Sequence, residues 1–440
     1  YPVGTGNVAL GDTSLDSLNA GNYNTAVGHQ ALTANTDGSN TAFGAFALKT
    51  VTTGGNNVAF GRQALESNTG DNNTAIGYRA LQDNTTGSPN TAVGYVALPN
   101  NTTGASNTAL GYIAMGDNTT GGSNVALGHQ ALTSNTTASN NTAVGYQAAY
   151  SNTTGAPITA FGYQAAYTNS TAEWVTAFGY QALRNTTAGP NTAFGRALVT
   201  NTTGTENTAM GQNANYYNTT GSYNVALGSS ALFLNTTASN NTAVGYQAGY
   251  TNTTGAENTA NGVQALYSNT TGGYSTAVGY RALFYNTTAS HNTAVGYQAG
   301  YSNQTAAGNV FVGENAGYFN TNQNNTFLGA GSGYFVTSGQ KNTILGSYNG
   351  NQGGLDIRTS SSNIVLSDGD GNPRGFYNNA ANGWVFGDGD ASTYWPNTSS
   401  VNNHNGVMIF PVSGAVGVTT NQGTALYLNR NSTSSPDGNV

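Results

Sequence analysis

Two pairs of aspartates come nearest, by type and spacing, to a metal site. Asp368 and Asp370 stand in the segment SDGDGN, and Asp388 and Asp390 stand in FGDGDAS, so carboxylates alternate with glycine as at the start of a calcium-binding loop. Such loops also use a bidentate glutamate further along, which both segments lack. We therefore expect tight β-turns, with Asp368 and Asp370 as metal candidates only, and we predict no cofactor.

The 4 histidines could act as general bases, but their places in the sequence argue against it. His29, His129 and His291 fill places in a repeated unit that unrelated residues fill elsewhere, and His404 lies in an Asn-rich stretch without a nearby carboxylate. GxSxG, HExxH and P-loop motifs are absent, and the repeats offer almost no paired Asp or Glu for glycoside hydrolysis. The sequence thus predicts that the protein is not an enzyme.

The composition of the chain limits the kinds of partner that it could bind. Only 6% of the 440 residues are charged, and 10 Lys and Arg against 17 Asp and Glu give a net charge of −7. Without a basic run to pair with phosphates, nucleic acid is not an expected partner. No apolar run approaches the roughly 20 residues that cross a bilayer, so we expect no membrane insertion. The absence of Cys excludes disulfides and thiolate ligands.

A short repeat positions three of the four histidines. The string NTAVGYQA at 141–148 recurs at 241–248 and 292–299, and related units begin every 16 or 17 residues from Asn7 to Asn342, 21 in all. A unit this short cannot enclose its own core, so each predicts one coil of a β-solenoid whose neighbours supply its hydrogen bonds. Positions are numbered from the Asn of N-T-A-x-G as position 1.

The columns through the repeat predict which side chains point inward. Position 5 is always glycine, which requires positive φ or closely packed backbone, as at Gly28, Gly145, Gly245 and Gly296. Positions 3 and 8 are small and predicted to face a narrow interior, while position 4 is branched or aromatic and position 9 is often Leu. Where position 9 is Ala or Gly, position 10 is Tyr, whose ring we expect to replace the missing volume. Position 6 mixes Tyr, His, Arg, Gln and Ser, and is predicted to face solvent.

The other half of the coil, N-T-T-G, has turn chemistry. Many copies also form N-x-Thr glycosylation sequons, at Asn84, Asn101, Asn118, Asn135 and Asn152. We expect a hydrogen-bonded Asn and Thr ladder instead of a dense glycan array. An ice-binding threonine face is a minor alternative, because alanines interrupt the threonine array.

The position-4 residues predict self-assembly. Two Ala columns make a small core, and a free ladder of large apolar residues would exceed the few hundred Å² that monomers usually expose. A closed arrangement of three chains about the long axis would cover each ladder, so we predict an elongated homotrimer; a dimer is not excluded by the spacing. Asn261 replaces the apolar residue at position 4 and is the predicted polar position at the trimer axis.

Beyond Gly346 the period fails. We predict a repeat shaft over 1–350, with a linker at 347–354, and a β-rich, intertwined C-terminal segment over 351–440. Strands are expected at 363–366, 383–386, 407–412, 415–418 and 425–428. Trp384, Tyr394 and Trp395 in this segment are candidate receptor contacts.

Several strings resemble a known family. NTAVGYQAGY at 241–250 and 292–301, NNTFLGAGSGY at 324–334 and SSNIVLSDGDGNPRG at 361–375 look like the repeat shaft of phage tail fibres that carry a C-terminal self-cleaving intramolecular chaperone. The A-V-G-x-x-A core is also similar to the heads of trimeric autotransporter adhesins, which are left-handed parallel β-rolls, although the coil here is longer.

This resemblance implies a structural and adhesive fibre. The expected role is a phage tail fibre that attaches the virion to a host surface, with other tail proteins and a host receptor or glycan as partners. The alternatives are a bacterial surface adhesin or extracellular filament and, from another class, a tailspike that degrades polysaccharide. The implied location is the virion, or else the cell surface or extracellular space.

Overall fold

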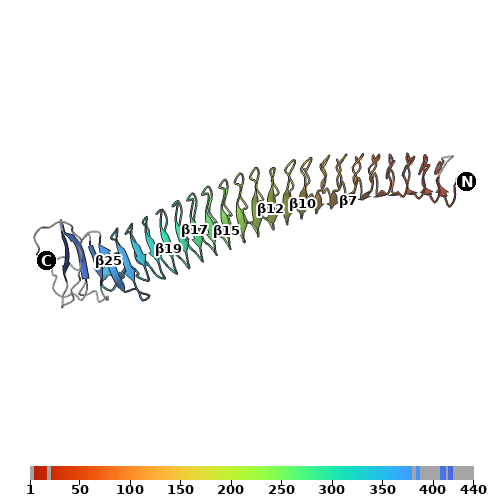
Figure 1. Ribbon diagram of the computed structural model, residues 1–440. Helices are drawn as coiled ribbons and strands as arrows, with labels where there is room; N and C mark the ends of the chain where they lie inside the picture. The colour runs from red at the N-terminus through yellow and green to blue at the C-terminus, as the bar shows by residue number, and fades with distance from the viewer. Residues whose placement is uncertain (1–3, 17–20, 379–382, 387–406, 413–414, 420–440) are drawn as a thin grey trace, which may run out of the picture. The chain divides into compact units, whose positions relative to one another are not determined.

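A computed structural model describes residues 4–16, 21–378, 383–386, 407–412 and 415–419, and all regular elements in these ranges are β-strands. The chain divides into two compact units, each considered by itself: residues 1–263 with 269–271 form the first unit, and residues 264–268 with 272–440 form the second unit. In both units short strands repeat along the chain, one per predicted coil (Figure 1). The predicted all-β parallel solenoid is confirmed.

The first unit holds sixteen strands, and coil n is named after its strand βn. These are β1 (Val8–Leu10), β2 (Thr25–Val27), β3 (Thr41–Phe43), β4 (Val58–Phe60), β5 (Thr74–Ile76), β6 (Asn90–Val93), β7 (Asn107–Leu110), β8 (Val125–Leu127), β9 (Thr142–Val144), β10 (Ile158–Phe161), β11 (Val175–Phe178), β12 (Asn191–Phe194), β13 (Asn207–Met210), β14 (Val225–Leu227), β15 (Thr242–Val244) and β16 (Thr259–Asn261).

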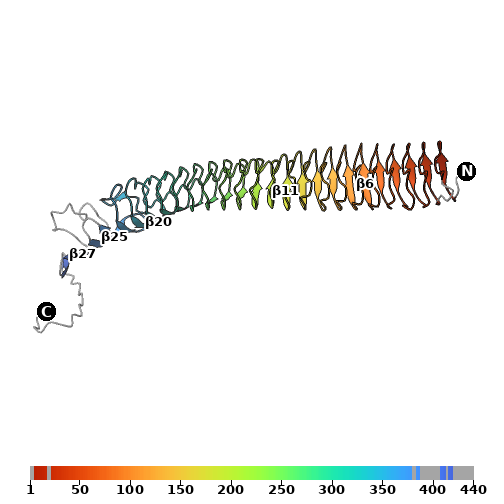
Figure 2. The same cartoon turned by 90° about the horizontal axis from the view of Figure 1, so that it is seen from above.

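Each strand of the first unit pairs in parallel with the next. The register places like positions opposite each other, for example Ala143 opposite Ala160 and Ala226 opposite Ala243. This stacking of successive coils is visible in Figure 2. Because the repeat length equals one turn of the coil, each column of the sequence becomes a ladder along the sheet.

The core is larger than the two expected alanine columns. Position 3 and 8 alanines are buried, as at Ala143 and Ala148, but so are the position-9 leucines such as Leu132. Asparagines at positions 1 and 12 are also buried, as at Asn124 and Asn118. The small core from which self-assembly was argued is therefore larger than two alanine columns, because leucine and hydrogen-bonded asparagine of the same chain fill the rest.

The position-5 glycines satisfy both reasons for an unbroken glycine column. φ is +134° at Gly28 and Gly145, +132° at Gly245 and +139° at Gly296, a region that side chains rarely adopt. A Cβ added to Gly145 would lie 2.5 Å from the carbonyl oxygen of Gly162 in the next coil. Any side chain in this column would strain its own backbone and collide with the coil beside it.

The corners of the coil use left-handed backbone at residues other than glycine. Gln147 at position 7 has φ of 52°, Leu132 at position 9 has 52°, and Asn140 at position 17 has 63°. Inter-coil hydrogen bonds hold this conformation: the N–H of Gln147 donates to the carbonyl of His129, and the N–H of Leu132 donates to that of Ala148. Tertiary stacking thus overrides the local cost of left-handed leucine.

The second unit begins with the same architecture and then changes. Its strands are β17 (Thr276–Val278), β18 (Thr293–Val295), β19 (Val310–Val312), β20 (Thr326–Leu328), β21 (Thr343–Leu345), β22 (Asn351–Gln352), β23 (Leu355–Asp356), β24 (Ile364–Ser367), β25 (Pro373–Asn378), β26 (Gly383–Phe386), β27 (Val407–Val412) and β28 (Ala415–Thr419).

Parallel pairing continues beyond the last repeat. β21 pairs in parallel with β24, and β24 to β28 then pair successively as antiparallel strands. The segment 347–354 is not a plain linker: Tyr348 is fully buried and donates its hydroxyl to the carbonyl of Leu355 at 2.7 Å, beside the hairpin of β22 and β23. The predicted strand at 425–428 lies outside the described residues.

The expected role of the position-10 tyrosines was wrong in the second unit. The space above Gly300, Gly317 and Gly333 is filled by Phe311 and Phe327, which replace alanine at position 3 and are fully buried. A Cβ on Gly317 would lie 2.4 Å from the ring of Phe311. Tyr301, Tyr318 and Tyr334 instead stack on one another outside the core, with ring centroids 4.9 and 5.1 Å apart.

Candidate functional site

An exposed apolar stripe runs along the outer face of the sheet in the first unit. It consists of the position-4 residues of the first unit, whose side chains point away from the core because positions 3 and 5 flank them in the strand. Leu10, Phe43, Phe60, Phe178 and Met210 are between 44% and 67% exposed. Phe43 stacks on Phe60 with centroids 4.9 Å apart, so part of the stripe is already ordered as a ladder.

Asn261 lies in this same exposed stripe, at the end of β16. It is exposed, and its partner across the sheet is Val244. Its predicted place at a trimer axis depends on partner chains and stays a prediction.

A second exposed column, in the turn that follows each strand, forms a tyrosine ladder, defined as the position-6 rings of coils 5 to 11. Adjacent rings stack with centroids 4.8–5.5 Å apart and planes within 28° of parallel. The members are Tyr78, Tyr95, Tyr112, His129, Tyr146, Tyr163 and Tyr180. Tyr95, Tyr163 and Tyr180 are exposed, which confirms the solvent-facing prediction for position 6 at these coils.

A glutamine column runs beside part of the ladder at position 7. The side-chain amide of Gln147 donates to that of Gln130 at 2.9 Å, and the amide of Gln164 donates to that of Gln147 at 3.0 Å. At coils 9 and 10 the exterior of the coil therefore carries an apolar column at position 4, a phenol column at position 6 and an amide column at position 7, and none of them is charged. Such a face can bind by packing and neutral hydrogen bonds.

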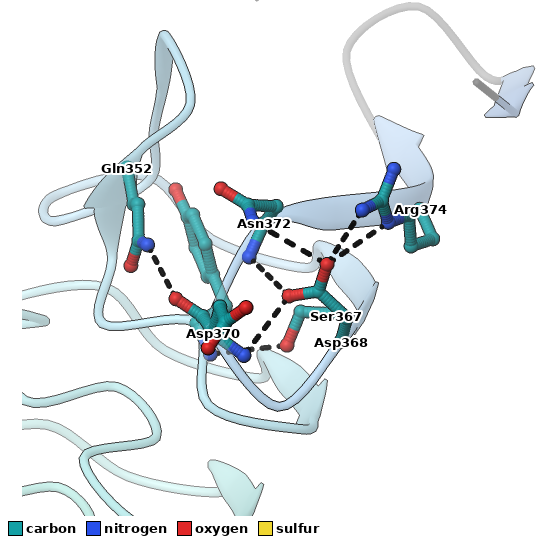
Figure 3. A network of polar contacts seen from close by, with 7 residues as sticks. Gln352, Ser367, Asp368, Asp370, Asn372 and Arg374 are labelled. Carbon is teal, nitrogen blue, oxygen red and sulfur yellow. Dashed lines mark hydrogen bonds and ion pairs between the residues drawn. The ribbon is translucent and has the colours of Figure 1, made fainter. Parts of the chain in front are cut away.

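Asp368 and Asp370 form a turn between β24 and β25, as expected. One carboxylate oxygen of Asp368 accepts the backbone N–H of Asn372 at 2.8 Å and of Asp370 at 3.1 Å (Figure 3). The other accepts from Arg374 at 2.7 Å. The Asn372 N–H and then the Arg374 guanidinium hold the pKa of Asp368 below its usual value.

In these contacts the carboxylate of Asp368 accepts the hydrogen bonds that close the turn and forms an ion pair with Arg374. Asp370 contributes its backbone carbonyl, which accepts from the side-chain amide of Gln352 at 2.6 Å (Figure 3). No group of three or more His, Cys, Asp or Glu that could hold a metal occurs in the part of the chain that the structure describes. Asp388 and Asp390 lie outside that part.

Of the candidate receptor contacts, only Trp384 lies within the described residues. Its ring stacks on Phe386 with centroids 5.4 Å apart and makes a tilted contact with Tyr377 at 5.6 Å. Tyr394 and Trp395 lie outside the described residues, so the structure does not bring these three candidates together.

The histidines within the described residues occupy ordinary positions of the repeat. His129 lies between Tyr112 and Tyr146 in the ladder, and His291 stacks on Tyr274 at 5.0 Å. The Nδ1 atom of His29 lies 3.5 Å from a carboxylate oxygen of Asp12, and both side chains are largely exposed. His404 lies outside the described residues.

The sequon asparagines form the hydrogen-bonded ladder predicted for them. The side-chain amide of Asn118 donates to the amide oxygen of Asn101 at 2.9 Å and accepts from Asn135 at 2.7 Å, and all three are fully buried. Glycosylation of the folded coil would require these buried nitrogens. The neighbouring threonine hydroxyls are also used within the protein, since that of Thr119 donates to the carbonyl of Thr136.

The fold and these exposed columns define the chain as an all-β repeat protein, a parallel β-solenoid with a patterned outer face. No helix with the length and hydropathy of a membrane span occurs in the described residues. Comparison with family models, curated proteins and solved structures finds no match to this chain. Its function must therefore be argued from the coil itself.

Proposed function

We propose that this chain is a structural and adhesive fibre protein, the repeat shaft of a phage tail fibre, which assembles with copies of itself and attaches a virion to a host surface. The observation that supports this most is the exposed apolar stripe along the first unit. No enzymatic activity is part of the proposal.

The stripe lies on a face large enough for a stable interface. The strands are three or four residues long, or about 10–13 Å at 3.3 Å per residue, and fifteen steps of about 4.8 Å separate β1 from β16. The product is on the order of 800 Å², close to the roughly 800 Å² per partner of a standard interface. Most of the position-4 column on this face is apolar, and monomers rarely expose so long a patch.

A second copy of this chain is the occupant that fits best. Its coils have the same spacing, so a parallel partner in register repeats each contact at every step. Three copies around one axis give each stripe two neighbours and close the assembly, whereas an open arrangement would continue indefinitely. In this homotrimer Asn261 interrupts the apolar contact once, which favours a single register.

The assembly is tested by the native mass of the purified protein. We expect three times the 44.8 kDa chain mass by light scattering. A variant that carries both Phe43→Glu and Phe60→Glu places charges in the stripe and should dissociate, while Thr103→Glu, in an exposed turn, should not. A monomeric wild-type protein would refute the assembly.

The role in attachment is tested separately. Antibodies against the first unit should label fibres on purified virus particles and block their adsorption to host cells. Labelling of continuous filaments without particles would instead support a bacterial filament.

A further inference from the structure

The tyrosine ladder stops at coil 12, where the repeat is one residue shorter. Coil 11 has Tyr180 and Gln181 between Gly179 and Ala182, but coil 12 has only Arg196 between its corresponding glycine and alanine. φ of that glycine, Gly195, is +88°, compared with +136° at Gly179. The missing residue changes the corner of the coil next to the last ring of the ladder.

The last ring of the ladder therefore has an open face. One face of Tyr180 stacks on Tyr163 with centroids 5.2 Å apart. On the other side of the Tyr180 ring, the nearest position-6 residue is Arg196, and its side chain contacts Tyr216. The Arg196 guanidinium lies 5.0 Å from the ring centroid of Tyr216 and donates to the Tyr216 hydroxyl at 3.0 Å. Within the described residues no ring or cation is recorded over the coil-12 side of Tyr180, which is 55% exposed.

The next ring in the position-6 column is Tyr246, four coils further along. It is exposed, and no stacking partner is recorded for it within the described ranges. Gln212 and Ser229 occupy the column between, and neither side chain makes a hydrogen bond to another of the residues that the structure describes. Since β11 to β15 pair without interruption, the two tyrosines bound a stretch of the column about 19 Å long, at about 4.8 Å per step, that carries no aromatic ring and is called the slot below.

The chemistry of this slot selects its ligand. An aromatic face carries partial negative charge and attracts the weakly positive C–H groups on the face of a sugar ring. Gln212 and Ser229 add neutral donors and acceptors for sugar hydroxyls. Arg196 is the only charged residue in the column here, and the chain as a whole is acidic, so a nucleic acid lacks the cations that its phosphates need.

The geometry points to a saccharide-binding slot between Tyr180 and Tyr246, in which a pyranose ring of a neutral glycan takes the place of the next ring over Tyr180. The slot rests on the proposed attachment function and names the class of surface molecule that the shaft would bind. Binding needs only one chain, because all five column residues come from the first unit.

The test is titration of the purified protein with maltotriose and with cellotriose, followed by nuclear magnetic resonance of the sugar. We expect at least one to bind, with Tyr180→Ala weakening binding by about tenfold or more, as is common for aromatic contacts at a binding centre. Arg196→Tyr should abolish binding because it places a ring in the coil next to Tyr180, in a column that accepts tyrosine elsewhere. Tyr223→Ala, an equally exposed tyrosine of the first unit, is the matched control and should bind as wild type does.

Three results would overturn the inference. The first is no binding of either sugar, and the second is binding that Tyr180→Ala and Arg196→Tyr leave unchanged. The third is a changed native mass in Tyr180→Ala, which would assign this face to contact between copies. A trimer that binds neither sugar would refute the slot and leave the proposed fibre standing, whereas sugar binding by a monomer would do the reverse.

Discussion

Asn215 offers a direct test of how the coil interior is stabilised. It occupies position 9 of coil 13, where Leu198 and Leu232 stand in the adjacent coils, and it is fully buried. Neither its side-chain oxygen nor its nitrogen has a hydrogen-bond partner within the described residues. Its φ of 47° is close to the 51° of both leucines, so Asn215→Leu can keep the backbone of the column.

Three effects set the expected magnitude. Removing an unsatisfied buried amide gains about 1–3 kcal/mol, and burying a leucine side chain gains about 1.5–3 kcal/mol. Leucine loses about 1–2 kcal/mol relative to asparagine in left-handed backbone, which asparagine tolerates better. The balance is a stabilisation of about 3 kcal/mol.

The assay is urea unfolding combined with hydrogen exchange of the amides in residues 207–223. The exchange measurement matters because a solenoid need not unfold in one step. We expect a higher urea midpoint and slower exchange for Asn215→Leu, and the opposite for the reverse change Leu132→Asn. Faster exchange in Asn215→Leu would show that the coil has closed around the smaller side chain, and would refute this account of the core.

Three further changes test other columns by urea midpoint. Gly145→Ala should destabilise the protein by about 3 kcal/mol or more, because the added Cβ would meet the Gly162 carbonyl. The control Gly331→Ala has open space around it and should cost about 1 kcal/mol. Equal effects of the two changes would contradict the close-packing argument. Asn118→Ala removes three buried hydrogen bonds and should cost about 3 kcal/mol, and a neutral result would refute the ladder's contribution. Burial raises the pKa of Tyr348 above the ordinary value of a tyrosine, about 10. The stabilisation from the neutral phenol is therefore present below about pH 10 and is lost at higher pH, as the unfolded state ionises. Tyr348→Phe should weaken this alkaline loss of stability, and an unchanged profile between about pH 9 and 11 would refute it.

The repeat made the coil predictable. The spacing of the strands, the inward alanines, the glycine column and the Asn ladder all follow from columns such as Ala143, Gly145 and Asn118, because one period equals one turn. The strands at 383–386 and 407–412 were also predicted with the bounds that the structure gives.

The backbone conformation of the corners and the filling of the core are hard to predict from the local sequence. Leucine in left-handed backbone, as at Leu132, contradicts its own preference and is held by hydrogen bonds between coils. The filling of the space over Gly300 by Phe311 could have been suspected from the loss of alanine at position 3, but only the packed coil identifies which residue fills it.

Part of the candidate slot could likewise be predicted from the sequence, and part could not. The run of aromatic residues at position 6 and the shortened coil 12 are both visible in the sequence, as a counted pattern and a missing residue. That Arg196 lies over Tyr216, and so leaves Tyr180 open, depends on the rotamer of one side chain among several neighbours.

The sequence by itself determined the period, and with it the parallel coil and the columns that face inward, because a repeated covalent pattern must give a repeated backbone. The tertiary structure decided how left-handed corners are held, what fills the core and where the aromatic ladder ends. These depend on contacts between coils, and each such contact joins residues about one repeat apart in the chain.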